Sequence, residues 1–203
     1  MDKQSVRQEM RTKLRSLSHE EIARKSTEIC KQFENSEKLQ FVFQKSENLA
    51  FYMPLSNEVD VTPLLLDALR EGRNCYLPRV IDDGNMEFFK IDNSVSLESQ
   101  LESGCYGILE PLLTLERLKK PFCYSDFSDM AIIVPGLAFG RDFTRIGKGK
   151  GYYDRFFEKL ELEGFKVFKI AVCFDCQLLD SVPHDKYDRK VDTIVTESHL
   201  IVI

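Results

Sequence analysis

The chain has 203 residues, a formal net charge of −5 and 43% apolar residues. These values are typical of a globular protein, and we expect a single domain over residues 1–203. The acidic balance argues against a general basic field for nucleic acid or anionic lipid. No apolar run approaches the roughly 18 residues of a membrane span, and the charged first residues do not resemble a signal peptide. We therefore expect a cytoplasmic monomer that binds neither nucleic acid nor a membrane.

The first third of the chain is predicted to be mostly helical. Apolar residues such as Met10 and Leu14 recur at helical spacing within residues 3–34, and "SHEE" at 18–21 resembles a capping box that opens a second helix. "LQFVFQ" ends a short third helix. "VTPLLLDALREG" has the Thr-Pro start and the glycine end that are typical of a further helix.

Strands are predicted between and after these helices. "NLAFYMPL" is typical of a buried strand stopped by Pro54, and further strand-like runs are "NCYLPRV", "MEFFKI", "MAIIVPGLAF", "FKIAVCF" and "DTIVTE". Alternation with helical patterns predicts a three-layer α/β fold with a largely parallel central sheet flanked by helices. Residues 92–126 have no clear pattern, and we expect loops there that border a site.

The six cysteines lie mostly in apolar surroundings, which is typical of reduced thiols. Cys173 and Cys176 form a CxxC. A zinc site would usually need a second pair or nearby histidines, so core packing is the default interpretation and a metal or redox role is the alternative.

The segment "RIGKGKGYYDRFF" at residues 145–157 is the strongest functional signal. Alternating glycines can turn several backbone N–H groups toward one anion, and the following helical pattern places them at a helix N-terminus. Lys148 and Lys150 add full positive charges, and the Arg145 guanidinium can bind two phosphate oxygens at once. The segment therefore predicts a polyphosphate-binding loop.

A flexible surface turn with solvated lysines is the alternative for this segment. It matches neither the Walker A pattern nor the dinucleotide fingerprint. The apolar run just upstream favours a site, because ligands of open α/β sheets bind outside the carboxyl ends of the strands.

Two aspartates are candidate magnesium ligands. Asp154 lies in the first turn of the predicted helix, where it either complements the helix dipole or binds a metal ion beside phosphates. Asp192, at the start of "DTIVTE", is a plausible second carboxylate, although spacing alone does not pair the two.

The long segment "VPGLAFGRDFTRIGKGKGYYDRFFEKL" resembles the signature of the 5-formyltetrahydrofolate cyclo-ligase family. The resemblance extends through "KQSVR", "FYMPLSNEVD", "YGILEP" and "KVDTIVTE", in the family's order. It implies a NagB/RpiA/CoA-transferase-like fold. It also implies cyclisation of 5-formyltetrahydrofolate to 5,10-methenyltetrahydrofolate, with ATP as co-substrate and Mg²⁺ as cofactor, through an N5-iminium phosphate.

The same resemblance implies the site residues. Those implied for catalysis are Arg145, Lys148 and Lys150. Those implied for ATP binding are Lys3, Gln4, Ser5, Val6, Arg7, Arg145, Ile146, Gly147, Lys148, Gly149, Lys150, Gly151, Tyr152 and Tyr153. Those implied for folate binding are Met53, Glu58, Lys148, Gly149, Lys150, Gly151 and Tyr152, and those implied for magnesium are Asp154 and Asp192. Without the resemblance, Lys3 and Arg7 are typical of a solvated helix face, Glu58 of a polar loop and Met53 of a strand end.

The chain departs from the family pattern at two positions. Many relatives have aspartate at the position of Gly140 and glycine at that of Phe143, so we expect Asp142 to take over the polar role in this turn. Two other functions stay open: another ATP-dependent phosphoryl transferase, and a non-catalytic phosphate- or RNA-binding module on the same fold. ATP consumption that depends strictly on 5-formyltetrahydrofolate would separate the two enzymes.

Overall fold

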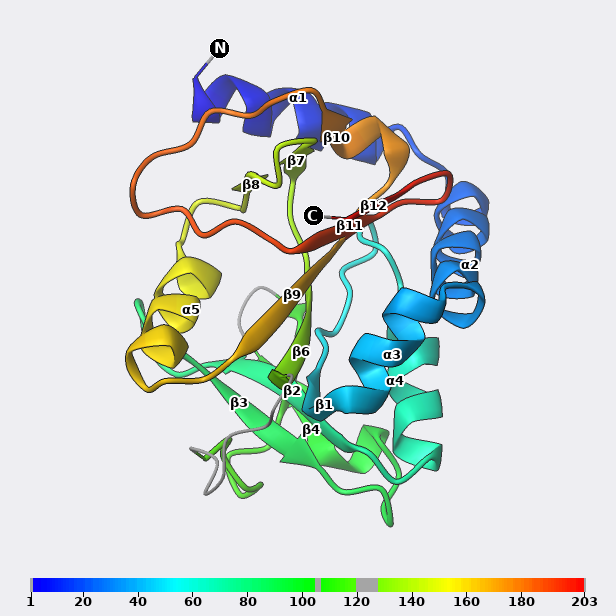
Figure 1. Cartoon of the computed structure of the whole chain (residues 1–203), viewed down its shortest axis with the longest axis vertical. Coiled ribbons are helices and arrows are strands. Elements are labelled where there is room, and N and C mark those ends of the chain that lie inside the picture. Colours follow the sequence, from blue (N-terminus) through cyan, green and yellow to red (C-terminus); the bar gives the residue numbers. More distant parts are fainter. Residues whose placement is uncertain (1, 105–106, 120–127, 203) are drawn as a thin grey trace.

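The computed structural model describes residues 2–104, 107–119 and 128–202. Its centre is a seven-stranded sheet in the order β12-β11-β9-β6-β1-β2-β3 (Figure 1). The five inner strands are parallel, and each edge strand pairs antiparallel with its neighbour. The strands of this sheet are β1 (Ser46–Ala50), β2 (Asn74–Val80), β3 (Met86–Ile91), β6 (Ser128–Val134), β9 (Val167–Val172), β11 (Thr193–Val195) and β12 (Leu200–Val202). The prediction of an α/β fold with a largely parallel sheet is confirmed.

Five α-helices cover this sheet in the described part of the chain: α1 (Lys3–Arg15), α2 (His19–Asn35), α3 (Glu37–Lys45), α4 (Thr62–Arg70) and α5 (Tyr152–Leu162). The predicted capping box is present at the start of α2, where the Ser18 hydroxyl accepts from the Glu21 amide and the Glu21 carboxylate accepts from the Ser18 amide. The carboxylate of Asp2 caps α1 in a similar way, which fixes the first turn of that helix.

The two faces of the sheet form two apolar cores. Successive side chains of a strand point to opposite faces, so Leu49 packs with α1 to α4 whereas Ala50 packs on the other face with α5. Phe156, Phe157 and Leu160 are the buried residues of α5. Burial of these two faces fixes the register of the strands, and their parallel pairing brings the carboxyl ends of the inner strands to one edge.

Two small sheets accompany the central one. The first contains β10 (Leu178–Leu179), β7 (Ala138–Gly140) and β8 (Arg145–Ile146), and the second pairs β4 (Leu101–Ser103) with β5 (Leu109–Pro111). Short 3-10 helices, η1 (Glu98–Gln100) and η3 (Asp175–Gln177), precede β4 and β10. The second sheet lies inside the segment that we expected to be loops only, so that expectation was wrong for β4 and β5.

Strand boundaries also differ from the prediction. "MAIIVPGLAF" is not one strand: β6 ends at Val134, and β7 belongs to another sheet. Pro135 has no N–H for a sheet ladder, which explains the break. Strand β1 ends at Ala50, before the predicted stop at Pro54.

Of the described cysteines, Cys30, Cys75 and Cys173 are buried and Cys176 is half-buried. Cys105 and Cys123 lie outside the described residues. Among the helices of the described ranges, none combines the length and apolar character that would let it cross a bilayer.

Candidate functional site

A cavity of about 850 Å³ opens at the carboxyl ends of the parallel strands, which is where open α/β sheets place ligands. Tyr52 and Met53 follow β1, Val80 ends β2, and Pro135 and Gly136 follow β6; all five line the cavity. Helix α1 and the loop before α5 supply further lining residues. The volume is in the range of small-molecule sites.

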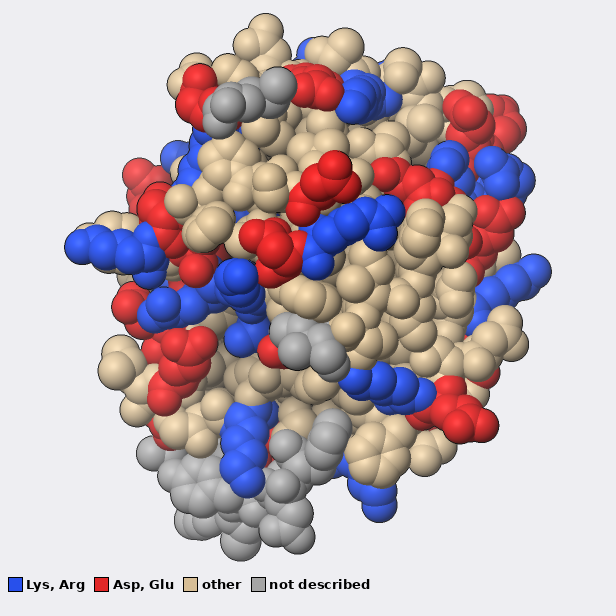
Figure 2. Space-filling model, turned by 45° about the horizontal axis from the view of Figure 1, so that its top comes forward, with Lys and Arg blue, Asp and Glu red and all other residues tan. Residues whose placement is uncertain are grey.

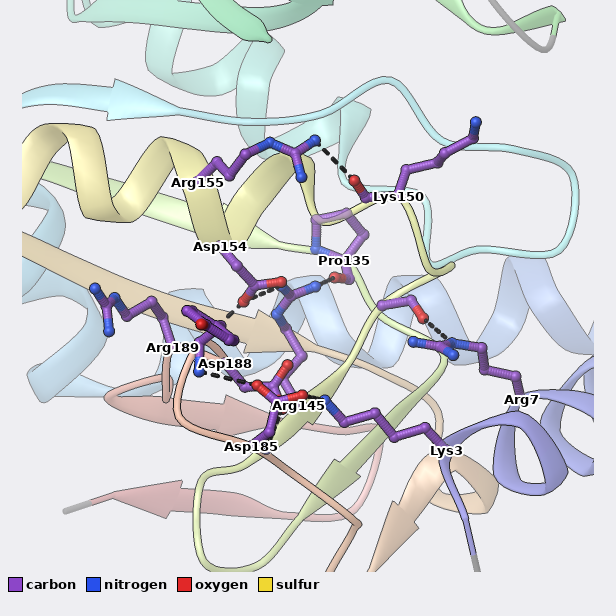
Figure 3. A network of polar contacts seen from close by, with 12 residues as sticks. Lys3, Arg7, Pro135, Arg145, Lys150, Asp154, Arg155, Asp185, Asp188 and Arg189 are labelled. Atoms are coloured by element: carbon purple, nitrogen blue, oxygen red, sulfur yellow. Dashed lines mark hydrogen bonds and ion pairs between the residues drawn. The ribbon is translucent and has the colours of Figure 1, made fainter. Parts of the chain in front are cut away.

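The glycine–lysine segment between β8 and α5, residues 147–151, is held in place by arginines that bind its carbonyls. Arg7 donates from Nε to the Gly147 carbonyl at 3.0 Å, and Arg11 donates to that of Lys148 at 3.4 Å. Arg155 donates to the Lys150 carbonyl at 2.7 Å (Figure 3). Two helices therefore fix three successive parts of this loop from its carbonyl side.

The glycines let the loop adopt backbone conformations that other residues avoid. Gly149 and Gly151 have φ angles of +108° and +70°, and the Arg7 guanidinium packs over Gly149. In the described residues, the amides of Gly147, Lys148 and Gly149 donate no hydrogen bond to a protein acceptor. These N–H groups are therefore available to an external acceptor, and the anion-binding nest that the sequence predicts stays a prediction.

The two lysines of the loop contact different parts of the cavity edge. Lys148 forms an ion pair with Glu58 at 2.6 Å, and Lys150 contacts Asp83 at 3.2 Å. The carboxylate of Glu58 also accepts from the Leu55 amide. Lys148 therefore joins the loop to the segment after β1. Lys148 and Glu58, both predicted to bind ligand, line the cavity.

Arg145 is buried beneath the loop, with its side chain 3% exposed. Its guanidinium donates to Asp154 Oδ1 at 3.0 Å and to the Pro135 carbonyl at 3.4 Å, and it lies over the Tyr153 ring. Both terminal nitrogens therefore have protein partners. The prediction that Arg145 binds two phosphate oxygens stays a prediction, and its contacts favour a role in positioning Asp154.

Two aspartates that the sequence analysis did not select lie beside this pair (Figure 3). Asp188 Oδ2 accepts from Lys3 Nζ at 2.5 Å and from the Asp185 amide at 2.7 Å, and Asp185 also contacts Lys3. Burial alone would lower the pKa of Lys3, but its ion pairs with the two aspartates raise it overall. The Asp154 Oδ1 atom accepts from the amide of Arg189, the residue after Asp188.

Asp154, Asp185 and Asp188 all line the cavity, whereas Asp192 does not. The Asp192 carboxylate accepts from the Lys169 amide at 2.7 Å at the side of β9, and burial raises its pKa above the ordinary value. The structure thus does not bring Asp192 to Asp154. The motif "DRKVD" contains both Asp188 and Asp192, and their spacing gave no reason to select Asp188 as a magnesium ligand.

The N-terminal segment contributes two of its five predicted residues. Lys3 and Arg7 line the cavity, one helical turn apart on α1. Gln4 and Ser5 are exposed and their amides are used in the Asp2 cap, and Val6 is buried in the core. Of residues 3–7, Lys3 and Arg7 therefore face the cavity, whereas Gln4, Ser5 and Val6 contribute to the helix cap and the core. We call Lys3, Arg7, Arg11, Arg145 and Lys148 the cationic wall.

The opposite lining is mostly apolar and comes from strand ends that lie far apart in the sequence. Val80 pairs with Met86 across β2 and β3, and β1 runs parallel to β2 on its other side. We call Met53, Pro78, Val80, Met86 and Ile108, all of which line the cavity, the apolar wall. A flat aromatic ligand fits such a surface.

Both tyrosines at the start of α5 line the cavity. Tyr153 is half-buried, its hydroxyl is inaccessible to water and has no hydrogen-bond partner in the described structure, and burial raises its pKa. Tyr152 packs against the Arg155 guanidinium. The two rings thus form the part of the helix start that faces the ligand space.

The turn at the two departures is well defined. Phe143 has a φ of +68°, a conformation that favours glycine, which is the residue we expected in relatives. Asp142 Oδ1 accepts from the Thr144 amide and hydroxyl, as predicted. A side chain at Gly140 would come within 2.3 Å of that carboxylate, so glycine at 140 and aspartate at 142 suit each other.

Positive and negative side chains are mixed over the face that includes α1, so neither sign covers it as a whole (Figure 2). The fold and the site thus define an α/β protein with an arginine-supported glycine loop beside a cavity at its strand ends.

Comparison with known proteins identifies the family. The model of the 5-formyltetrahydrofolate cyclo-ligase family matches residues 1–197, so the chain belongs to this family of enzymes. The mouse protein named 5-formyltetrahydrofolate cyclo-ligase is 26% identical over 197 residues, covering 96% of this chain and 93% of its own. A Schizosaccharomyces pombe protein named as a probable member is 28% identical, covering 99% and 98%.

A solved structure agrees with this assignment. The structure of Aquifex aeolicus 5,10-methenyltetrahydrofolate synthetase superposes with a TM-score of 0.78 at 31% identity, covering 100% of this chain and 93% of that one. The family and the fold predicted from the sequence are confirmed.

Proposed function

We propose that this protein cyclises 5-formyltetrahydrofolate to 5,10-methenyltetrahydrofolate, consuming one ATP and releasing ADP and phosphate. The observation that carries the proposal is the cavity itself, in which an anion-binding nest and an apolar wall face one ligand space. Family membership supplies the substrate. The reaction needs both features, because a polyphosphate must meet the formyl group of a flat pteridine.

The chemistry follows from what the formyl oxygen requires. As an amide-like oxygen it leaves poorly, so it first attacks the γ-phosphorus of ATP, which forms an O–P bond and releases ADP. The N10 nitrogen then attacks the activated formyl carbon. Cleavage of the C–O bond expels phosphate, N10 loses its proton, and the five-membered ring is closed with the methenyl carbon as a cation.

The described residues can supply what phosphoryl transfer demands, which is alignment and neutralisation of charge. The amides of Gly147, Lys148 and Gly149 would bind phosphate oxygens, with the side chains of Lys148 and Lys150 beside them. The Lys148 ammonium group has three donors, so it can keep its ion pair with Glu58 while it contacts a phosphate oxygen. The buried Arg145 holds the carboxylate of Asp154 at the helix start, so the acidic group is in place before the nucleotide binds.

The donor set fits magnesium. Asp154 and Asp188 each have one oxygen bound to protein donors and a second oxygen without a protein partner in the described residues, and both line the cavity. Mg²⁺ prefers one or two carboxylates together with substrate phosphates and water. We assign Asp154 and Asp188 to it, and the ion would neutralise charge on the phosphates. The earlier choice of Asp192 has no support from its position.

A spectroscopic assay tests the proposal. Purified protein is incubated with 5-formyltetrahydrofolate and Mg·ATP, and the absorbance of the methenyl product is followed together with ADP release. We expect both products in equal amounts, and neither without ATP. ADP release that does not depend on the folate would instead indicate another phosphoryl transferase, and the proposal would fail.

A further inference from the structure

We propose that Glu110 is a specificity-determining residue that binds the 2-amino-4-oxo edge of the pterin ring of the folate. This inference rests on the proposed function. Glu110 lies on β5 in the "YGILEP" segment, to which the sequence analysis gave no role, and it lines the cavity next to the apolar wall.

The first observation is that Glu110 is buried without a compensating cation. Its exposed fraction is 4%, and no lysine, arginine or histidine of the described residues forms an ion pair with it. A buried carboxylate is costly unless other groups bind it. The Val80 amide donates to Oε1 at 3.2 Å, and no other hydrogen bond reaches this carboxylate within the described ranges.

The second observation is that the neighbouring backbone makes room for this carboxylate. Gly104 follows β4, and a side chain there would come within 2.1 Å of Glu110 Oε2. Glycine therefore permits the acidic group to lie between the end of β4 and the end of β2. The small β4–β5 sheet, which the sequence analysis did not predict, places the carboxylate of Glu110 beside the apolar wall.

A comparison of the three glutamates that line the cavity singles out Glu110. Glu58 is paired with Lys148 and with the Leu55 amide, and Glu158 is paired with Arg189. Glu110 has capacity to accept further hydrogen bonds, and it lies among apolar residues that suit an aromatic ring. Its missing partner is therefore a neutral N–H donor on a flat ligand.

The chemistry of the two ligands decides between them. The pterin edge presents two adjacent donors, the N3–H and the 2-amino group, which match a carboxylate. The corresponding edge of adenine presents one donor beside one acceptor, and the acceptor would face a carboxylate oxygen. Glu110 therefore fits the pterin and not the nucleotide base.

The protein-side test is Glu110→Gln, with Glu102→Gln as the matched control. Glu102 is the cross-strand partner of Glu110 in the β4–β5 sheet, but its carboxylate binds Arg79 outside the cavity lining. We expect the KM for 5-formyltetrahydrofolate to rise about 10- to 100-fold in Glu110→Gln, because one charged acceptor is replaced by a donor–acceptor amide. The KM for ATP should not change, and the control should resemble wild type.

The first comparison of the ligand-side test uses wild-type protein alone and therefore does not depend on the variant folding. Equilibrium binding is measured without ATP for 5-formyltetrahydrofolate and for its 2-desamino-2-methyl analogue. Wild type should bind the analogue about tenfold or more weakly, and Glu110→Gln should lose most of this preference.

Three results would overturn the inference: an unchanged folate KM in Glu110→Gln, an increase in the KM for ATP alone, or equal binding of both ligands by wild type. In each case normal cyclisation by wild type would leave the proposed function intact. Absence of the methenyl product would be a failure of the proposed function instead.

Discussion

The two walls of the cavity are built in different ways. The cationic wall comes from one helix and one short segment, and its residues hold each other through hydrogen bonds to backbone carbonyls and through ion pairs. The apolar wall comes from strand ends between residues 53 and 108, and it is held by burial and strand register. The first wall is fixed by side-chain contacts between two short segments that lie far apart in the sequence, and the second by the register of the sheet.

This difference separates the effects that mutation should have. Changes in the cationic wall should alter phosphoryl transfer, whereas changes in the apolar wall should alter folate affinity. Two contacts link the start of α5 and the loop before it to the β2–β3 turn beside the apolar wall: Lys150 binds Asp83 and Arg155 binds the Gly84 carbonyl. We expect the two sets of kinetic effects to remain distinct if the walls bind different ligands.

The largest expected effect is that of Lys150→Ala. If Lys150 contacts the transferring phosphoryl group as proposed, loss of its charge should lower kcat by about 10²–10³-fold, as for removal of an oxyanion-hole donor. Steady-state kinetics with saturating folate would measure this. Lys119→Ala, which removes an exposed lysine away from the cavity, should turn over normally. A Lys150→Ala enzyme with wild-type kcat would remove the loop from the phosphoryl-transfer site.

The sequence predicted the loop better than it predicted residues that are brought to the cavity by tertiary contacts. The loop was recognisable because its glycines, lysines and helix start are contiguous, so local chemistry predicted local structure. Glu110 was not recognisable, because its burial depends on β5 lying beside the end of β2, which is a tertiary contact. Asp188 was missed for the same reason: only the fold of residues 180–192 brings it beside Asp154.

Arg145→Met should test how the cationic wall is stabilised. Arg145 is buried and paired with Asp154, and removing one member of a buried pair leaves a charge without compensation. We expect a loss of about 3 kcal/mol in the free energy of unfolding, measured by denaturant titration. The exposed pair of Arg24 and Glu28 gives the control, since Arg24→Met should cost about 0.5 kcal/mol or less. Equal losses in both variants would refute the structural role of Arg145.

Asp188→Asn and Asp192→Asn distinguish the two candidate partners of Asp154. Loss of a residue that only supports a metal ligand typically weakens metal affinity about 10- to 100-fold. If Asp188 binds magnesium directly, Asp188→Asn should weaken the apparent affinity for Mg²⁺ by at least this amount. Asp192→Asn should give a wild-type titration because its carboxylate lies at β9. Magnesium activation curves at fixed ATP measure both. A shift in Asp192→Asn alone would restore the choice made from sequence.

Gly149→Ala should disturb the nest with a smaller effect. At a φ of +108° an alanine is strained, and we expect a cost of about 1–2 kcal/mol in the free energy of unfolding. Gly84→Ala is the control, because its φ is not positive and a Cβ there would meet only Asp82, at 3.7 Å. Thermal unfolding of both variants would make the comparison. An unaffected Gly149→Ala protein would mean that the loop does not need this conformation.

The smallest effect concerns Asp192 and pH. Burial raises the pKa of this carboxyl above its ordinary value of 3.8, so the folded protein binds this proton more tightly than the unfolded chain does. Its contribution to stability is therefore fully present below pH 3.8 and is lost as the pH rises through the raised pKa. Asp192→Asn has no such proton. Its amide oxygen can still accept from the Lys169 amide.

Asp192→Asn should therefore gain stability relative to wild type as the pH rises from about 4 to 7. Denaturant titrations of both proteins over this interval give the difference in the free energy of unfolding at each pH. A metal ligand in this position would behave differently, since bound Mg²⁺ would favour the charged carboxylate, and the gain would then shrink when the metal is added. A gain that is the same with and without Mg²⁺ would mean that Asp192 does not bind the ion, and a gain abolished by Mg²⁺ would support Asp192 as a magnesium ligand.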